Sequence, residues 1–123
     1  INIYEWTEED PTGVVRIAQW SKTDGTGVCP VGFRVPTLTE LKTETLDNGV
    51  TDSATAFSNF LKFPVAGTRN TFDGSMYGQG SWGNVWTSSA NGSNYQSVNF
   101  DSRNANWNNN NRANGLSVRC VEN

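Results

Sequence analysis

The first part of the chain changes from strand-like to helix-like patterning. Residues 1–6 alternate in character and residues 14–20 are apolar, so two short strands are predicted there. A charged turn at residues 8–13 separates them. Thr37 then stands three residues before Glu40, which is the capping-box spacing that marks the start of a helix.

Two helices are predicted after this cap. The first has apolar side chains at helical spacing, namely Leu38, Leu41 and Leu46. It ends at the Asp-Asn-Gly of residues 47–49, because glycine favours the C-terminal cap of a helix. The second begins at Asp52 or Ser53 and runs to about Lys62. Its apolar side chains have the same spacing: Ala54, Phe57, Phe60 and Leu61.

The second half is patterned as strands with glycine-rich and asparagine-rich connections. Pro64 ends the second helix and starts an extended segment. Residues 73–83 form a loop whose glycines lack the spacing of a phosphate-binding loop. Residues 84–89 and 95–100 are predicted as a β-hairpin with an Asn-Gly turn at 91–92.

The chain ends in a segment of alternating side chains, residues 116–121. Leu116, Val118 and Cys120 fall on one side of it, so a half-buried strand is predicted. With helices in the first half and antiparallel strands in the second, the predicted fold class is α+β. A length of 123 residues suits a single domain, residues 1–123.

Asparagine dominates the segment before this last strand. Ten of the 24 residues from Asn91 to Asn114 are asparagine. Strand-like segments flank the tract, which is therefore predicted to be an ordered recognition loop on a rigid scaffold. The alternative is a disordered low-complexity segment. Trp86, Phe100 and Trp107 are interleaved with or adjoin the asparagines and favour order.

The composition excludes several kinds of partner. The net charge is −3 and no basic patch occurs, so nucleic acid is not expected to bind. Without histidine the chain lacks the commonest general base and metal ligand, and neither a metal nor another cofactor is expected. No apolar run approaches the roughly 20 residues of a membrane helix, so membrane insertion is not expected. The start at Ile1 rather than Met indicates a trimmed or mature form, whose location the sequence does not show.

The two cysteines, Cys29 and Cys120, leave two possibilities open. They are too few to complete a tetrahedral zinc site on their own. They form either a disulfide bond that closes a long loop or two buried free thiols of a cytoplasmic protein. A bond requires their Cα atoms to lie within about 7 Å of each other.

Four stretches, in order, resemble motifs of one protein family. As they stand here they are Cys29-Pro-Val-Gly-Phe-Arg-Val-Pro-Thr37, Phe63-Pro-Val-Ala-Gly-Thr-Arg69, Gly80-Ser-Trp-Gly-Asn-Val-Trp-Thr-Ser-Ser89 and Asn111-Arg-Ala-Asn-Gly-Leu-Ser-Val-Arg-Cys-Val121. They resemble segments of the C-type-lectin-like family that contains the major-paralogous-domain proteins and the variable proteins of diversity-generating retroelements. The match spans residues 28–122 and departs at Thr68, where an aromatic residue is usual.

This resemblance implies a C-type lectin-like fold, with two helices packed on twisted antiparallel strands, long ordered loops, and both termini in one sheet. It implies a variable ligand-binding region at about residues 82–115 and a scaffold strand at 116–122. In the retroelement group, adenines in a template copy of the gene are randomised, which changes asparagine codons into many others. An asparagine-rich surface therefore resembles the undiversified state. The calcium site of sugar-binding lectins is not expected, because Glu-Pro-Asn is absent and Trp107-Asn-Asn109 lacks the carboxylate that calcium prefers.

The resemblance and the asparagine pattern together predict a display protein that binds a protein or glycan on a host or environmental surface. Asparagine supplies adaptable hydrogen bonds and tyrosine a rigid apolar plane, which suits such a surface. The predicted contact residues are Trp82, Asn91, Asn94, Tyr95, Asn104, Asn106, Trp107, Asn108, Asn109, Asn110, Asn111 and Asn114. A phage tail or bacterial cell surface is the expected location, with attachment to a larger fibre or surface assembly.

Two other functions stay open beside this one. A structural or adhesin domain of a surface lipoprotein or fibre would carry the asparagines as a merely solvated loop. A carbohydrate-active enzyme would need catalytic carboxyls, which in a retaining glycosidase stand about 5 Å apart. Asp73 and Asp101 are the only acids between residues 63 and 121, so they are the only candidate pair there. The leading expectation is a protein that is not an enzyme.

Three arginines, Arg34, Arg69 and Arg119, are predicted to belong to the scaffold rather than to the contact surface. Each lies within a motif beside apolar residues. There the stem of an arginine can pack and its guanidinium can donate to buried carbonyl oxygens.

Overall fold

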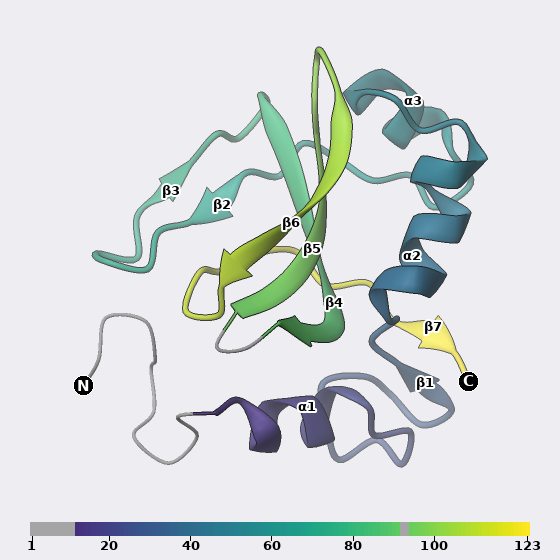
Figure 1. Ribbon diagram of the computed structural model, residues 1–123, viewed down its shortest axis with the longest axis vertical. Helices are drawn as coiled ribbons and strands as arrows, with labels where there is room; N and C mark the ends of the chain where they lie inside the picture. Colours follow the sequence, from purple (N-terminus) through teal and green to yellow (C-terminus); the bar gives the residue numbers. More distant parts are fainter. Residues whose placement is uncertain (1–11, 92–93) are drawn as a thin grey trace.

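The computed structural model describes residues 12–91 and 94–123 (Figure 1). Its helices are α1 (Val14–Trp20), α2 (Leu38–Glu44) and α3 (Ser53–Ser58), with a 3-10 turn, η1 (Leu46–Asn48), between the last two. Its strands are β1 (Phe33–Arg34), β2 (Thr68–Arg69), β3 (Met76–Tyr77), β4 (Trp82–Asn91), β5 (Asn94–Asp101), β6 (Ala105–Asn111) and β7 (Val121–Glu122). The strand predicted at residues 1–6 and the tip of the predicted turn at 92–93 lie outside the described residues.

A three-stranded antiparallel sheet, in the order β4-β5-β6, forms the centre of the fold. β4 and β5 pair as the predicted hairpin, with Val85 opposite Val98. Two short antiparallel ribbons, β1 with β7 and β2 with β3, flank this sheet. In Figure 1, α2 and α3 lie on one side of the sheet and α1 lies below it. The α+β class is confirmed.

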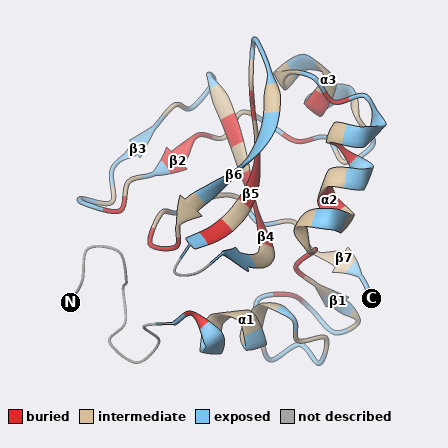
Figure 2. Cartoon of the chain, in the orientation of Figure 1, coloured by how far each residue is buried: buried red, intermediate tan, exposed pale blue. Residues whose placement is uncertain are grey.

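The main core fills the space between the sheet and the helices α2 and α3. Its buried side chains come from both layers: Leu41, Val50, Ala56 and Phe63 from the helical half, and Val85, Val98 and Phe100 from the sheet. Figure 2 shows the buried positions concentrated along β4 and β5. Burying apolar area in this way supplies most of the free energy that holds such a fold.

The two predicted helix starts are confirmed, although one helix is shorter than expected. The Thr37 hydroxyl accepts from the Glu40 amide and the Glu40 carboxylate accepts from the Thr37 amide, a complete capping box. Asp52 caps α3 in the same reciprocal way. α3 ends at Ser58 rather than Lys62, and Phe57 and Phe60 are exposed. The chain turns early because Phe63 must reach the core, where its ring stacks on that of Phe100.

Residues 14–20, predicted as a strand, form helix α1 instead. An apolar run of this length does not distinguish a strand from a helix by its period. Ile17 and Trp20, three residues apart, are half-buried, whereas Val14 and Val15 are more than half exposed. The Trp20 ring packs on sheet residues at the face opposite α2, so an amphipathic helix covers that face better than a strand would.

The strand predicted at residues 116–121 is also wrong, except at its end, because β7 contains only Val121 and Glu122. Val118 is 39% exposed, so it is not a core residue. Ser117 instead bridges β4: its amide donates to the Asn84 carbonyl and its carbonyl accepts from the Trp86 amide. The chain crosses β4 at this one point and then leaves to pair with β1, which prevents a continuous strand.

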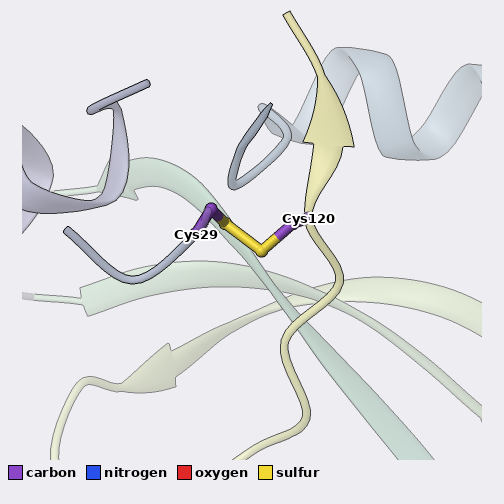
Figure 3. The surroundings of a disulfide bond; sticks show 2 residues. All are labelled: Cys29 and Cys120. Atoms are coloured by element: carbon purple, nitrogen blue, oxygen red, sulfur yellow. A yellow bond between two sulfur atoms is a disulfide. The ribbon is translucent and has the colours of Figure 1, made fainter. Parts of the chain in front are cut away.

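A disulfide bond joins Cys29 and Cys120, whose Cα atoms lie 5.8 Å apart (Figure 3). Of the two possibilities the sequence left open, the disulfide is the one formed. It ties the loop before β1 to the segment before β7, next to the point where these two strands pair. The two cysteines are 91 residues apart in sequence, so the bond closes most of the chain into one loop.

Candidate functional site

The asparagine tract is a strand rather than the predicted loop. β6 pairs in register with β5 over seven residues and forms an edge of the central sheet. Ala105 packs on the core and stands opposite Phe100, which anchors the start of the strand. The tract can pair because a neighbouring strand with buried valine and phenylalanine offers its backbone, although asparagine itself has a low strand propensity.

The pleat of β6 divides the tract between two faces of the sheet. Side chains alternate along a strand, and directly paired residues point to the same face. Asn106 and Asn108 therefore share a face with their partners Asn99 and Ser97. Trp107 stands opposite Val98 and belongs to the other face. The predicted contact residues thus do not form one continuous surface.

The predicted contact residues fall into three groups by exposure. The exposed group is Asn91, Asn94, Asn104, Asn106, Trp107, Asn108 and Asn109. The half-buried group is Trp82, Asn110, Asn111 and Asn114. Tyr95 alone is buried, at 1% exposure. We use the name exposed set for the seven members of the first group.

Tyr95 is a framework residue, so its assignment as a contact residue is corrected. Its hydroxyl donates to the Gly13 carbonyl at 2.6 Å. Its ring centroid lies 5.5 Å from that of Trp20 and 6.2 Å from that of Trp86. Buried tyrosines usually pair their hydroxyl in this way, and the interaction fixes α1 against β5. A ligand cannot reach the side chain without displacing α1.

Two of the half-buried asparagines support the strand that carries them. The Asn110 amide donates to the hydroxyl of Ser97, which is fully buried, at 2.6 Å. The Asn111 side chain accepts from the Ala113 amide at 2.9 Å and so shapes the turn after β6. Their hydrogen bonds are committed to the framework, which leaves the exposed set as the part of the tract available to a ligand.

A polar row crosses the face of the sheet that carries Asn106 and Asn108. Asn84, Asn99 and Asn106 stand directly opposite one another on β4, β5 and β6, and we call them the asparagine row. In the next pair along, Trp82 stands opposite Asp101. The other end of this face is covered, because Trp20 of α1 packs on Trp86 and Tyr95.

A small cavity of about 230 Å³ lies at the open end of this face. It is lined by Trp82, Asn84, Asn99, Phe100 and Asp101. Of these only Trp82 was predicted as a contact residue, and Asn84 and Asn99 were missed. The spacing of Trp82, Asn84 and Trp86 by two residues was the signal that could have placed Asn84 beside Trp82, but the predicted strand began only at Asn84.

Thr68 holds two walls of this cavity in place. Its hydroxyl oxygen accepts from the indole nitrogen of Trp82 at 3.2 Å and from the side-chain amide of Asn84 at 3.0 Å. The Tyr77 ring meets the indole edge-on at 5.6 Å. Thr68 is buried at the position where the resembled family has an aromatic residue, and here its small polar side chain orients the site.

The two candidate catalytic carboxyls are both engaged by local turns. Asp101 accepts from the amides of Arg103 and Asn104, and these hydrogen bonds lower its pKa. Asp73 accepts from the amide and hydroxyl of Ser75, which lower its pKa as well. Asp73 does not line the cavity. A glycosidase acid needs a raised pKa, whereas the hydrogen bonds to these two carboxyls lower their pKa values.

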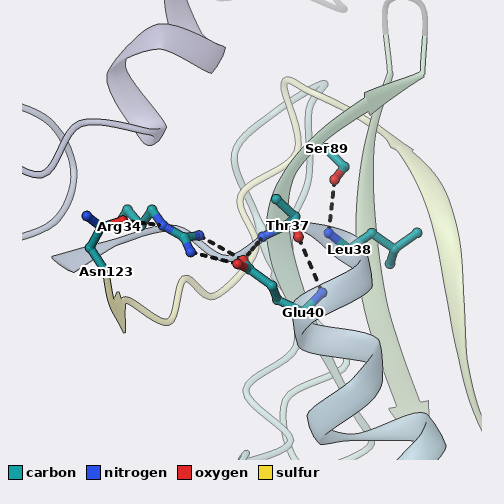
Figure 4. Close-up of polar contacts among 6 residues, drawn as sticks. All are labelled: Arg34, Thr37, Leu38, Glu40, Ser89 and Asn123. Carbon is teal, nitrogen blue, oxygen red and sulfur yellow. Dashed lines mark hydrogen bonds and ion pairs between the residues drawn. The ribbon is translucent and has the colours of Figure 1, made fainter.

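The polar contacts around the start of α2 belong to the framework (Figure 4). The guanidinium of Arg34 donates to both oxygens of Glu40, at 2.7 and 2.6 Å, and its Nε donates to Asn123. The Leu38 amide donates to the Ser89 hydroxyl and so links α2 to β4. These contacts link α2 to β1, to the C-terminal Asn123 and to β4.

The other two arginines predicted as scaffold also contact the framework. Arg119 lies over the Phe63 ring, with 5.1 Å between the guanidinium carbon and the ring centroid. Arg69 donates to the Gly74 carbonyl within the β2–β3 turn. Neither of them lines the cavity beside Asp101.

The described part of the chain has neither a cluster of metal-ligating side chains nor a helix that could span a membrane. Across residues 12–91 and 94–123, no three side chains of histidine, cysteine, aspartate or glutamate come together as metal ligands would. Over the same residues, every helix is too short or too polar to cross a membrane. Comparison of the chain with protein-family models, with curated proteins and with solved structures found no match.

Proposed function

We propose that this chain is a ligand-binding display protein whose exposed, asparagine-rich residues recognise a macromolecule on a host or environmental surface. The observation that carries the proposal is the separation of the exposed set from the framework. Those seven side chains point to solvent, while neighbouring residues of the same tract support the strand. A surface whose side chains are not needed by the fold can be adapted to a ligand.

The chemistry of the exposed set suits recognition. Asparagine presents two donors and an acceptor on a short side chain, so it adapts to many partners at a low entropy cost. Trp107 adds a half-exposed aromatic side chain, and such residues often anchor binding surfaces. Placing these side chains on a paired strand positions them better than a mobile loop would.

The proposal includes a finer fold, the C-type lectin-like domain of retroelement variable proteins. Its support is the place of the four motif stretches. Residues 29–37 lead into α2, residues 63–69 enter β2, and residues 80–89 form most of β4. The fourth stretch, residues 111–121, carries Cys120, which bonds to the Cys29 of the first. In this proposal the asparagine codons are the positions that the retroelement would diversify.

A pair of matched libraries tests the binding function. The first randomises the exposed set. The control randomises seven exposed positions on the helical side: Thr39, Thr43, Glu44, Ala54, Phe57, Ser58 and Phe60. Both are displayed on yeast, sorted for folded protein, and selected against biotinylated lysozyme and biotinylated ubiquitin. We expect binders to each probe from the first library and few from the control.

Two outcomes would count against this function. If both libraries gave binders equally often, the exposed set would have no special role in recognition. If neither gave binders, a structural domain with a merely solvated face would be favoured. The retroelement part is tested separately by the gene's neighbourhood, where we expect a reverse transcriptase gene and a second copy of the terminal segment.

A further inference from the structure

We propose that the cavity beside the asparagine row binds a single neutral pyranose ring of a glycan, without a metal ion. The walls are Trp82, Asn84, Asn99 and Asp101. The inference rests on the proposed binding function, because it names the ligand class for one part of the same surface. Four properties of the cavity lead to it: an orphaned acceptor, paired donors and acceptors, a fixed aromatic wall, and the absence of basic side chains among its lining residues.

The first property is the buried side-chain oxygen of Asn99. This atom accepts no hydrogen bond from any residue that the structure describes. A buried acceptor without a donor destabilises a protein, so a ligand that supplies the donor gains more than it would at an exposed oxygen. Proteins retain such unfavourable groups mainly where function requires them. The oxygen is covered in this structure, so a ligand hydroxyl reaches it when the Asn99 side chain turns toward the cavity that this residue lines.

The second property is the mixture of donors and acceptors on the walls. Thr68 fixes the amide nitrogen of Asn84, which leaves its oxygen as an acceptor. The amide nitrogen of Asn99 can donate. Asp101 directs its Oδ1 to its own turn, and its Oδ2 accepts from the exposed Arg103 guanidinium at a long 3.4 Å, which leaves a lone pair of Oδ2 for a second donor. A hydroxyl both donates and accepts, so neighbouring sugar hydroxyls match such alternating walls.

The third property is the fixed position of the Trp82 indole. Besides its bond to Thr68, the ring lies against Gly78, where a Cβ atom would come within 2.1 Å of the indole. Gly78 has a φ of +75°, so both its backbone conformation and the lack of space require glycine. A preorganised aromatic wall loses little entropy when the apolar C–H face of a sugar packs on it.

The fourth property is the charge of the lining, and the volume of the cavity limits the ligand further. The cavity lining contains one carboxylate and no lysine or arginine. The Arg103 guanidinium, 3.4 Å from Oδ2 of Asp101, balances the charge of this carboxylate. The site therefore carries no net charge, and a neutral ligand suits it. The volume of about 230 Å³ is below the roughly 300–1,000 Å³ of pockets that enclose drug-sized ligands. One sugar ring fits this space better than a folded peptide or an oligosaccharide would, and the rest of a glycan would extend over the exposed set.

The test uses NMR on the ¹⁵N-labelled chain in the presence of EDTA. The probes are the methyl glycosides of mannose, galactose, glucose and N-acetylglucosamine, with methyl glucuronide as the acidic comparison. We expect at least one neutral glycoside to shift the indole signal of Trp82 and the side-chain amide signals of Asn84 and Asn99 in a saturable way. We expect no such shift from the glucuronide.

Variants then test whether the glycoside binds in this cavity or elsewhere on the surface. Asn99→Ala and Asn84→Ala should each weaken binding of the responding glycoside by roughly tenfold, the effect of about 1.4 kcal/mol. Phe57→Ala, at an exposed aromatic side chain of α3 that does not line this cavity, should leave binding unchanged. Thermal melts show which variants are folded, and either of the two asparagine variants is sufficient for the comparison.

The outcomes distinguish this inference from the proposed function. If no neutral glycoside shifts the three signals, or if binding survives both asparagine substitutions or needs calcium, the glycan inference fails. Binders from the exposed-set library would then leave the display function standing. If a glycoside binds as expected but that library yields no binders, the display function fails and the sugar site remains as a fixed binding property.

Discussion

At the scale of single residues, Glu40 connects three parts of the chain through one carboxylate. It accepts from the Arg34 guanidinium and from the Thr37 amide, and it lies in the first turn of α2. The hydrogen bonds from Arg34, then those from Thr37, lower the pKa of Glu40 from 4.5 to about 2. The Thr37–Glu40 spacing made the cap predictable, but the sequence did not show that Arg34 would share the same carboxylate.

The lowered pKa of Glu40 predicts an acid-dependent loss of stability. The contribution of Glu40 to the free energy of unfolding is fully present above pH 4.5, the pKa of this carboxyl in the unfolded chain. It is lost as the pH falls through about 2, its pKa in the folded protein. The side chain is 43% exposed, so solvent screening limits the effect to about 1 kcal/mol. Glu40→Gln keeps a capping acceptor but loses the charge. We expect the unfolding free energies of the two proteins to differ at pH 7 and to converge near pH 2.

Urea titrations at a series of pH values measure this difference directly. Taking the difference between the two proteins removes the contribution of Asp52, Asp73 and Asp101, whose pKa values are lowered by their own local hydrogen bonds. A difference that stayed constant from pH 7 to pH 2 would show that the Arg34–Glu40 pair does not stabilise the protein.

At the scale of elements, the helices were more predictable than the strands that carry the site. A capping box is a local signal, so the starts of α2 and α3 followed from their sequence. β6 gave no such signal, because a run of one polar residue type has no apolar-polar alternation. Its strand form depends on β5, which is held in place by Val98 and Phe100. The division of the tract between two faces followed only from that pairing.

Tyr95 is a second case in which the sequence did not decide the role of a residue, here a candidate contact residue on β5. An aromatic residue in an asparagine-rich tract can be a core residue or a contact residue, and composition does not decide between them. The outcome depended on α1, which covers Tyr95 through Trp20 and Gly13. Since residues 14–20 were predicted as a strand, no packing partner for Tyr95 was expected on that side of the sheet.

The disulfide is the main tether between elements, and its loss should be measurable. It closes a loop of about 91 residues, for which the chain-entropy relation gives about 4–5 kcal/mol of stabilisation. We expect dithiothreitol to lower the melting temperature of the native protein substantially. The Cys29→Ala/Cys120→Ala double variant should melt at the lower temperature with or without the reductant. Equal melting temperatures for the oxidised and reduced native protein would contradict a stabilising role for this bond.

At the scale of the whole molecule, the framework and the proposed recognition surface share the same three strands. The framework consists of the core behind the sheet, α1 over part of its front, and the disulfide between Cys29 and Cys120. The surface is what these leave open: the asparagine row, its cavity and the exposed set. Because the strands are fixed from behind, substitutions on the open part should change what the protein binds without changing its fold.

This separation predicts contrasting effects of substitution on stability. Asn104→Tyr, Asn106→Ser and Asn108→Asp change exposed side chains. Each should alter the free energy of unfolding by no more than about 0.5 kcal/mol. The triple variant should stay folded, with an effect close to the sum of the three. Leu41→Ala, in the core at 2% exposure, should cost about 2–5 kcal/mol.

Two further substitutions serve as matched controls for that contrast. Asn110→Ala removes a hydrogen bond to the buried Ser97 hydroxyl, so it should cost about 1 kcal/mol although it lies in the same tract. Val118→Ala should have little effect, because that side chain is 39% exposed and so was wrongly placed in the core by its alternation. Urea unfolding of each variant provides the comparison, provided that the slope of the unfolding free energy against urea concentration is the same for all of them. If the triple variant unfolded while Leu41→Ala remained stable, the exposed set would be holding the sheet together, and the division into surface and framework would be the wrong way round.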